Sequence, residues 1–283
     1  MIIRFSNPND IQNIISLWQE SFGDSERDIR FFLDYNYKPD NTLVIELDGK
    51  IVSMLFLLEG ELRINCIDYP SYYLYAACTA ESFREKGFMF KLLNEAASVA
   101  KSRKKDFICL KPAEDSLYTF YEKNGYITAF NKKILTLQKS ELNLASTAEK
   151  CVDIRFDTLR NNAFSNFDYF KWGDKAIHFA AKQTNYYHGN VLKTCKGYCL
   201  YDAFDSEIHV KEYAFTEENF DYGLSQLAAM NDFQKIVIEL PCRYKTENKN
   251  IKIIKSGMLY PVTARSKKIA ENVKDAYLSL TLD

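Results

Sequence analysis

The sequence predicts an α/β (α+β) protein built from two successive units. Short apolar segments that suit strands alternate with segments whose apolar residues repeat at helical spacing. A similar succession of segments recurs in the second half of the chain, after a polar stretch at residues 139–150. The length of 283 residues is enough for two ordinary domains. We therefore expect one unit over residues 1–142 and a second, smaller one over residues 151–283.

The composition indicates a globular protein without a nucleic-acid or membrane function. It is 47% hydrophobic and 27% charged, and a net charge of −1 provides no basic field for such partners. No apolar run approaches the roughly 20 residues of a membrane span, and Met1–Phe5 leads straight into a strand without a signal-peptide layout. Seven scattered cysteines suit reduced thiols, and the pair Cys195 and Cys199 lacks partners for zinc. We expect a cytoplasmic protein without a metal site, and a homo-oligomer stays open.

The first unit begins with a strand, two helices and three further strands. Asn7 and Pro8 suit the N-cap and first position of a helix, and Asp48-Gly49 predicts a type I′ hairpin. Five apolar residues share one face of the first helix: Ile11, Ile14, Ile15, Trp18 and Phe22. We expect strands at 2–6, 42–47, 50–58 and 72–79, helices after Asn7 and Ser25, and a bend near Glu59-Gly60 in a strand that runs on to Asn65.

The unit continues with two helices and three strands. One helix is indicated by apolar residues at i, i+3, i+4, i+7, i+8 and i+11, namely Met89, Leu92, Leu93, Ala96, Ala97 and Ala100. A second helix over 116–123 is closed by Asn124-Gly125, and strands are expected at 106–110, 126–130 and 133–138. The predicted order is therefore β-αα-β-β-β-α-β-α-β-β.

A polar turn joins the strand at 72–79 to the following helix and carries Arg84-x-x-Gly87. The first N–H groups of a helix lack intrahelical partners, and the helix dipole is positive at that end, so the site favours an anion. Glycine lets backbone approach a phosphate without a Cβ in the way. The turn therefore predicts a site for a phosphorylated cofactor.

Three segments in a fixed order carry a family resemblance. The strand ends in Ala77-Cys78-Thr79, the turn reads Arg84-Glu85-Lys86-Gly87-Phe88-Met89, and a later helix ends in Phe120-Tyr121-Glu122-Lys123-Asn124-Gly125-Tyr126. Together they resemble the GCN5-related N-acetyltransferase (GNAT) superfamily over about residues 1–140. The resemblance implies a mixed, mostly antiparallel central sheet flanked by helices. A second GNAT-like unit without the turn is similar to the layout of enhanced-intracellular-survival type acetyltransferases, without their C-terminal sterol-carrier-like domain.

The resemblance implies an N-acetyltransferase with acetyl-CoA as co-substrate. Its acceptor would be the primary amine of a small molecule or peptide, which attacks the thioester directly. The implied cofactor-binding residues are Cys78, Thr79, Arg84, Glu85, Lys86, Gly87, Phe88, Met89 and Phe90. Met89 stands where the family has a small residue, so we expect a narrower pyrophosphate cradle there.

Tyr121 is the candidate general acid, because the leaving thiolate needs a proton and a phenol is protonated at neutral pH. The alternative is a core tyrosine, and Tyr118 and Tyr126 are neighbours with the same side chain. Glu59 is the candidate general base, with Glu61 as the second choice. For both glutamates an exposed strand carboxylate is the alternative.

The second half repeats the outline without the turn. We expect a helix at 172–184 and a later one at 217–230, with strands at 198–204, 207–215, 235–241, 251–254 and 258–264. No Arg-x-x-Gly segment separates the strand ending at 215 from its helix. A non-catalytic GNAT-like acyl-CoA-binding module is therefore the alternative function. A nucleotide-binding protein of another class is disfavoured, because the turn at 84–87 has a single glycine.

Overall fold

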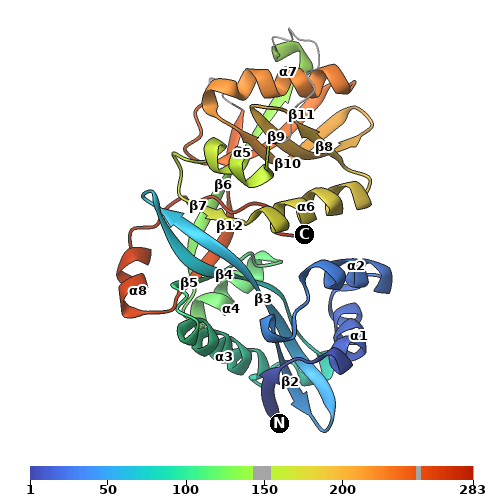
Figure 1. The fold of residues 1–283 in the computed structure, drawn as a ribbon, viewed down its shortest axis with the longest axis vertical. Coiled ribbons are helices and arrows are strands. Elements are labelled where there is room, and N and C mark those ends of the chain that lie inside the picture. The colour runs from blue at the N-terminus through green and yellow to red at the C-terminus, as the bar shows by residue number, and fades with distance from the viewer. Residues whose placement is uncertain (143–153, 247–249, 283) are drawn as a thin grey trace. The chain divides into compact units, whose positions relative to one another are not determined.

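The computed structural model describes residues 1–142, 154–246 and 250–282 (Figure 1). The chain divides into two compact units. The first comprises Met1–Gly60, Tyr69–Ile127 and Met258–Glu271, and the second comprises Glu61–Asp68, Thr128–Gly257 and Asn272–Asp283. Each unit is thus assembled from separate stretches of sequence. The predicted linker at 139–150 lies mostly outside the described residues, so a domain boundary there stays a prediction.

The first unit contains the N-terminal strands and four longer helices. Its strands are β1 (Ile2–Phe5), β2 (Thr42–Leu47), β3 (Lys50–Ile64), β4 (Ile67–Thr79), β5 (Phe107–Leu110) and the end of β12 (Ile251–Pro261). Its helices are α1 (Ile11–Phe22), α2 (Glu26–Asn36), α3 (Phe88–Ser102), α4 (Asp115–Lys123) and the short α8 (Ala264–Ala270). Three 3₁₀ turns join them: η1 (Pro8–Asp10), η2 (Pro39–Asn41) and η3 (Glu81–Phe83).

The sheet of the first unit has the strand order β1-β2-β3-β4-β5-β12. β1, β2 and β3 pair antiparallel, whereas β4 and β5 run parallel. The mixed α/β fold with a mostly antiparallel sheet is confirmed. β12 pairs antiparallel to β5, with Met258 opposite Leu110. The sequence analysis assigned this last strand to the second half, because a short apolar run does not reveal a pairing partner that lies far away in the chain.

The hairpin of β3 and β4 is longer and more regular than predicted. β3 continues through Glu59 and Gly60 to Ile64, and β4 begins at Ile67. Asn65 and Cys66 form the turn, and both have positive φ, at 48° and 64°. Two left-handed residues are the geometry of a type I′ hairpin, but Asn-Cys is a weak signal for it.

The core of the first unit lies where α3 and α4 pack on the sheet. The face predicted for α3 is confirmed, because Leu92, Leu93, Ala96 and Ala100 are all buried. The wider cluster adds strand residues and tyrosines, including Leu43, Val52, Leu55, Leu57, Tyr72, Leu74, Ile108, Leu110, Tyr118, Tyr121, Tyr126 and Met258. In α1, Ile14, Ile15 and Trp18 are buried, but Phe22 is 43% exposed. Apolar periodicity thus identified the packed faces, with the helix end as the exception.

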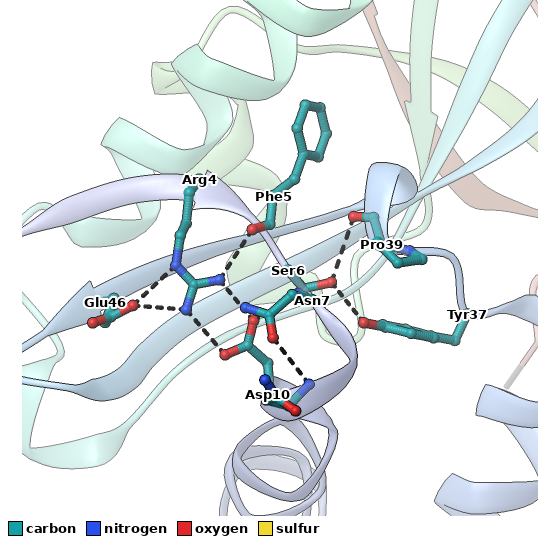
Figure 2. Close-up of polar contacts among 9 residues, drawn as sticks. Arg4, Phe5, Ser6, Asn7, Asp10, Tyr37, Pro39 and Glu46 are labelled. Carbon is teal, nitrogen blue, oxygen red and sulfur yellow. Dashed lines mark hydrogen bonds and ion pairs between the residues drawn. The ribbon is translucent and has the colours of Figure 1, made fainter.

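An ion cluster fixes the N-terminal strand of the first unit (Figure 2). Arg4 donates to both carboxylate oxygens of Asp10, at 2.6 and 2.9 Å, and its Nη2 is 2.6 Å from Glu46 Oε2. Asp10 also accepts from the backbone N–H of Asn7, which closes a capping box around η1. The Arg4 guanidinium holds the pKa of the Asp10 carboxyl below its ordinary value. The cluster therefore links β1, η1 and β2.

The second unit has its own sheet and helices. Its strands are β6 (Ile127–Gln138), β7 (Tyr169–Lys171), β8 (Asn190–Lys193), β9 (Gly197–Phe204), β10 (Glu207–Phe215), β11 (Lys235–Pro241) and the first part of β12. Its helices are α5 (Phe156–Ala163), α6 (Asp174–Tyr186) and α7 (Phe220–Met230), with 3₁₀ turns η4 (Lys139–Glu141) and η5 (Glu217–Asn219). The strand order is β12-β6-β11-β10-β9-β8, and β10 runs parallel to β11. β6 is one strand where the sequence predicted two.

A buried ion pair lies inside the second unit. Arg160 Nε donates to Glu212 Oε1 at 2.6 Å, and both side chains are 0% exposed. Arg160 also donates to the carbonyl oxygen of Phe170 and to Ser279 Oγ, while the Tyr198 hydroxyl donates to Glu212. Desolvated charges need such additional partners, so this network holds α5, β7, β9, β10 and the C-terminal segment together.

Candidate functional site

β4 extends past its neighbour on one side. The parallel ladder between β4 and β5 pairs Ser71–Tyr73 with Phe107–Cys109, whereas β4 continues to Thr79. Ala76 has φ +47°, which marks a distortion of the strand, because non-glycine residues rarely adopt this region. Around it Tyr75, Ala76 and Ala77 are half-buried, although the preceding residues are buried. The last part of β4 therefore presents backbone groups beyond the ladder with β5.

The turn after β4 ends in an uncapped helix start. Glu85 and Gly87 have φ +62° and +77°, and Gly87 is the N-cap of α3 without a side-chain cap bond. The first turn of α3 holds no acidic residue. Among the described residues, a Cβ at Gly87 would meet no atom within 4 Å beyond the two chain neighbours, so the space above the glycine is open. Unpaired N–H groups, the positive end of the helix dipole and this open approach fit a phosphate group.

Two basic side chains fold onto this turn. Arg84 Nε donates to the carbonyl oxygen of Thr79 at 3.2 Å, and Lys86 Nζ donates to that of Ser82 at 2.7 Å. Both side chains are exposed, so they add positive charge at the start of α3. Glu20 of α1 supports the turn from the other side, because its carboxylate accepts from the backbone N–H of Glu81 at 2.7 Å.

The three apolar residues of the predicted cradle separate into two environments. Phe88 and Met89 are partly buried and pack against the core of the first unit, whereas Phe90 is 53% exposed. The Met89 side chain therefore contributes to the packing of α3. The long side chain at this position is explained by the core beneath the helix.

Cys78 and Thr79 are held by Ser53 of β3. Ser53 Oγ lies 2.9 Å from the carbonyl oxygen of Cys78 and 2.9 Å from Thr79 Oγ1. The Cys78 side chain is buried, and burial raises the pKa of its thiol to about 12. The thiol is therefore protonated at neutral pH, which argues against Cys78 as a nucleophile.

Tyr121 of α4 lies close to Cys78. Its side chain is 8% exposed, and its ring packs against Phe120 and Tyr126 at centroid distances of 5.2 and 5.4 Å. Burial, and to a lesser degree the neighbouring Cys78, raise the pKa of Tyr121 to about 12. Tyr126 is enclosed between Tyr121 and Tyr260, so it belongs to the core. The structure thus brings Tyr121 to the end of β4.

The family of the N-terminal region is now decided. Residues 2–129 match the family model described as an acetyltransferase (GNAT) domain. The N-terminal region, residues 2–129, therefore belongs to the GNAT acetyltransferase family. The matched segment contains the end of β4, the uncapped turn and Tyr121. No curated protein matches the chain.

Solved structures with the same fold extend over both units of the chain. A GCN5-related N-acetyltransferase from Kribbella flavida is 15% identical, with a TM-score of 0.73, and the match covers 94% of this chain and 73% of that chain. One from Anabaena variabilis is 13% identical, with a TM-score of 0.74, and covers 94% and 74%. Eis1 from Mycobacterium abscessus is 10% identical, with a TM-score of 0.68, and covers 93% and 74%. These likenesses show a shared fold, and this chain spans about three quarters of each of these proteins.

The structure does not bring Glu59 to the end of β4 in this GNAT domain. Glu59 forms an ion pair with Lys105, just after α3, and its side chain is 63% exposed. Ser53, which contacts Cys78 and Thr79, precedes Glu59 by six positions, or about 20 Å along the strand. Glu61 belongs to the second unit, where it pairs with Lys171 at 3.0 Å. A base role for either stays a prediction, and these contacts favour the alternative of strand carboxylates in ion pairs.

Sequence reasoning missed Ser53 and Glu20. Ser53 was visible as a lone polar residue within the apolar run Ile51–Leu58. Glu20 gave no local signal, because its contact with the N–H of Glu81 depends on how α1 packs near η3. Within the described residues, no group of three or more His, Cys, Asp or Glu side chains is placed to hold a metal ion. None of the helices in that part combines the length and apolarity needed to cross a bilayer.

Proposed function

We propose that the chain transfers the acetyl group of acetyl-CoA to the primary amine of a small molecule or peptide. One observation carries the proposal: β4 runs beyond its ladder with β5 and leads through the turn at residues 80–87 into the uncapped start of α3, with Tyr121 close to Cys78 at the strand end. A strand end beside an anion site suits an extended ligand with a phosphate group. Acetyl-CoA has such a pyrophosphate and an amide-containing arm that ends in a thioester.

The turn supplies the phosphate-binding part of the proposed site. The backbone N–H groups from Arg84 to Phe90 would receive the pyrophosphate, since the N-cap of α3 has no side-chain cap bond and the first turn of the helix holds no acidic residue. Arg84 and Lys86 add positive charge. The end of β4, at the buried Cys78 and the half-buried Thr79, would pair with the arm in the manner of an added strand, and a backbone N–H there would polarise the thioester carbonyl.

The chemistry is a direct transfer. The amine nitrogen attacks the thioester carbon, the C–S bond breaks, and the sulfur leaves as a thiolate that takes a proton. Tyr121 is the proposed donor. Its pKa of about 12 keeps the phenol protonated at neutral pH. Burial disfavours a charged thiolate, so an enclosed leaving sulfur would favour protonation as the C–S bond breaks.

The attacking amine must also lose a proton. We propose that water at the half-buried stretch Tyr75–Ala77 receives it, because these residues are the accessible part of the strand. Glu59 remains the general base predicted from the sequence. Its carboxylate forms an ion pair with Lys105.

The test is release of free CoA from acetyl-CoA with a panel of amines, for the wild type and for Tyr121→Phe. Tyr118→Phe is the matched control, because Tyr118 lies on the same helix and its pKa is also raised to about 12. General acid catalysis typically contributes about 10²–10⁴-fold, so Tyr121→Phe should lose activity on that scale while Tyr118→Phe keeps most of it. Melting temperatures with and without acetyl-CoA show whether each variant is folded and binds.

The outcomes separate the two functions. A thermal shift with acetyl-CoA but no release with any amine would support the acyl-CoA-binding module. If acetyl-CoA produced no thermal shift and no CoA were released with any amine, the use of acetyl-CoA would be contradicted. Equal activity of Tyr121→Phe and the wild type would leave transfer intact and remove Tyr121 from the mechanism.

A further inference from the structure

The Ser53 hydroxyl connects β3 to the end of β4 in a way that fixes proton positions. Ser53 is 0% exposed, and its Oγ lies 2.9 Å from two oxygens, the carbonyl of Cys78 and the hydroxyl of Thr79. A hydroxyl group carries one proton and two acceptor lone pairs, whereas a carbonyl oxygen only accepts. Ser53 therefore donates its single proton to Cys78.

The direction of the second hydrogen bond follows from the first. Ser53 has no further proton, so the hydroxyl of Thr79 donates to Ser53 Oγ. The Thr79 proton consequently points toward the sheet, and the remaining acceptor capacity of its oxygen is directed elsewhere. Thr79 is half-buried, and its own carbonyl oxygen already accepts from Arg84 Nε. Its side-chain oxygen is thus an acceptor of fixed polarity at the accessible end of β4.

We propose that Thr79 Oγ1 accepts a hydrogen bond from an N–H group of a substrate, and that Ser53 is the positioning residue that fixes this polarity. The inference rests on the proposed function, because it assigns a specific contact within that site. Two sources supply such an N–H: an amide of the acetyl-CoA arm, or the amine acceptor. A ligand oxygen without a proton is disfavoured, because the Thr79 proton is engaged by Ser53.

Three variants test the pair. Thr79→Val removes the hydroxyl at nearly constant shape, Thr79→Ser keeps it, and Ser53→Ala frees the Thr79 hydroxyl to turn its proton outward. Acetyl-CoA affinity is measured by calorimetry, and the KM of the best amine is measured at saturating acetyl-CoA. A lost hydrogen bond of about 1 kcal/mol corresponds to about 5-fold weaker binding. We expect that loss for Thr79→Val, a smaller loss for Ser53→Ala, and near wild-type values for Thr79→Ser.

The double variant Ser53→Ala/Thr79→Val decides whether Ser53 acts through Thr79. Its substrate affinity should equal that of Thr79→Val, because no Thr79 hydroxyl remains for Ser53 to orient. Weaker acetyl-CoA binding assigns the N–H to the cofactor arm, and a raised amine KM with unchanged acetyl-CoA affinity assigns it to the acceptor.

Fully additive effects, or no effect of Thr79→Val on either quantity, would overturn the inference. Ser53 is buried, so melting temperatures check that its variant is folded, and the half-buried Thr79 variants carry the test if it is not. The wild type provides the separate readout: binding and turnover there support the proposed function whatever the variants do. A wild type that binds no acetyl-CoA overturns both.

Discussion

The two units each contain a strand, a 3₁₀ turn and a helix in succession, followed by a strand parallel to the first. In the first unit these are β4, η3, α3 and β5; in the second they are β10, η5, α7 and β11. In both, the parallel ladder ends before the first strand does, at Tyr73 and at Val210. The same scaffold thus leaves a strand end beyond its ladder twice.

The two strand ends are used differently. The end of β10, from Glu212 to Phe215, is fully buried, and the Tyr244 hydroxyl donates to the carbonyl oxygen of Phe215 at 3.0 Å. The turn before α7 is shorter, at residues 216–219 against 80–87, and it carries Glu217 and Glu218 where the first unit has basic residues. The end of β10 is therefore covered by side chains of the second unit, whereas the end of β4 in the first unit is partly accessible. The turn and the burial of the strand end, more than the strand arrangement, therefore distinguish the proposed binding end of β4 from the buried end of β10.

The largest effect is expected from the buried ion pair that accompanies the filled end. Arg160→Met leaves Glu212 buried without its cation, and breaking such a pair costs about 3–5 kcal/mol of unfolding free energy. Denaturant unfolding measures the loss. The variant Arg160→Met/Glu212→Leu should recover most of it, because no charge is then buried alone. A single variant within 1 kcal/mol of the wild type would contradict the structural role of this pair.

Tyr244→Phe tests how Tyr244 covers the end of β10. The Phe215 carbonyl would lose its hydroxyl partner in a buried place, which costs about 1–3 kcal/mol. The exposed Tyr187 is the control, and Tyr187→Phe should leave the melting temperature unchanged. Acetyl-CoA affinity should be the same in both variants. A change in that affinity would mean that the two strand ends are not functionally distinct.

Gly87→Ala tests the open end. Gly87 has φ +77°, and a Cβ there costs about 1–2 kcal/mol of backbone strain while it projects into the open space of the cradle. Gly49→Ala is the matched control, because Gly49 has φ +78° and is equally uncrowded but lies in the β2–β3 hairpin. We expect similar losses of stability and about 10-fold weaker acetyl-CoA binding for Gly87→Ala alone. Equal affinities of the two variants would contradict a phosphate site at Gly87.

Asp10→Asn contrasts the N-terminal ion cluster with the buried pair. Because Arg4 lowers the pKa of Asp10 in the folded state, the contribution is present above the unfolded pKa, near 3.9, and disappears as the pH falls through the folded value. At neutral pH we expect the variant to be about 1 kcal/mol less stable. The difference from the wild type should shrink below about pH 4 in urea titrations. A difference that is constant with pH would contradict the ionic origin.

The smallest effect is expected for Glu59→Gln. Its carboxylate is exposed in the pair with Lys105, and exposed pairs contribute about 0.2–1 kcal/mol. CoA release should change less than 2-fold at saturating substrate concentrations. A loss of 10-fold or more would instead establish the base role predicted from the sequence.

The parts of the fold that depend on local pattern were predictable. The helix faces of α1 and α3 followed from apolar spacing, and the turn at Arg84 and Gly87 followed from residue types that a helix start requires. What failed depends on distance along the chain. The pairing of Met258 with Leu110 and the short strands β7 and β8 have no local signature. The base role of Glu59 stays a prediction, and only the tertiary fold shows that its carboxylate pairs with Lys105, six positions along β3 from Ser53.

The placement of β12 has a consequence for how the molecule is made. The sheet edge at β5 is covered by Met258–Pro261, although the family segment ends at residue 129. As the nascent chain leaves the ribosome, residues 2–129 emerge early, but more than a hundred further residues must follow before β12 can cover this edge. An uncovered strand edge is a template for wrong pairing. Expression of residues 1–142 alone should therefore yield an aggregation-prone fragment. The strand that covers the edge of β5 is encoded in the second half of the sequence.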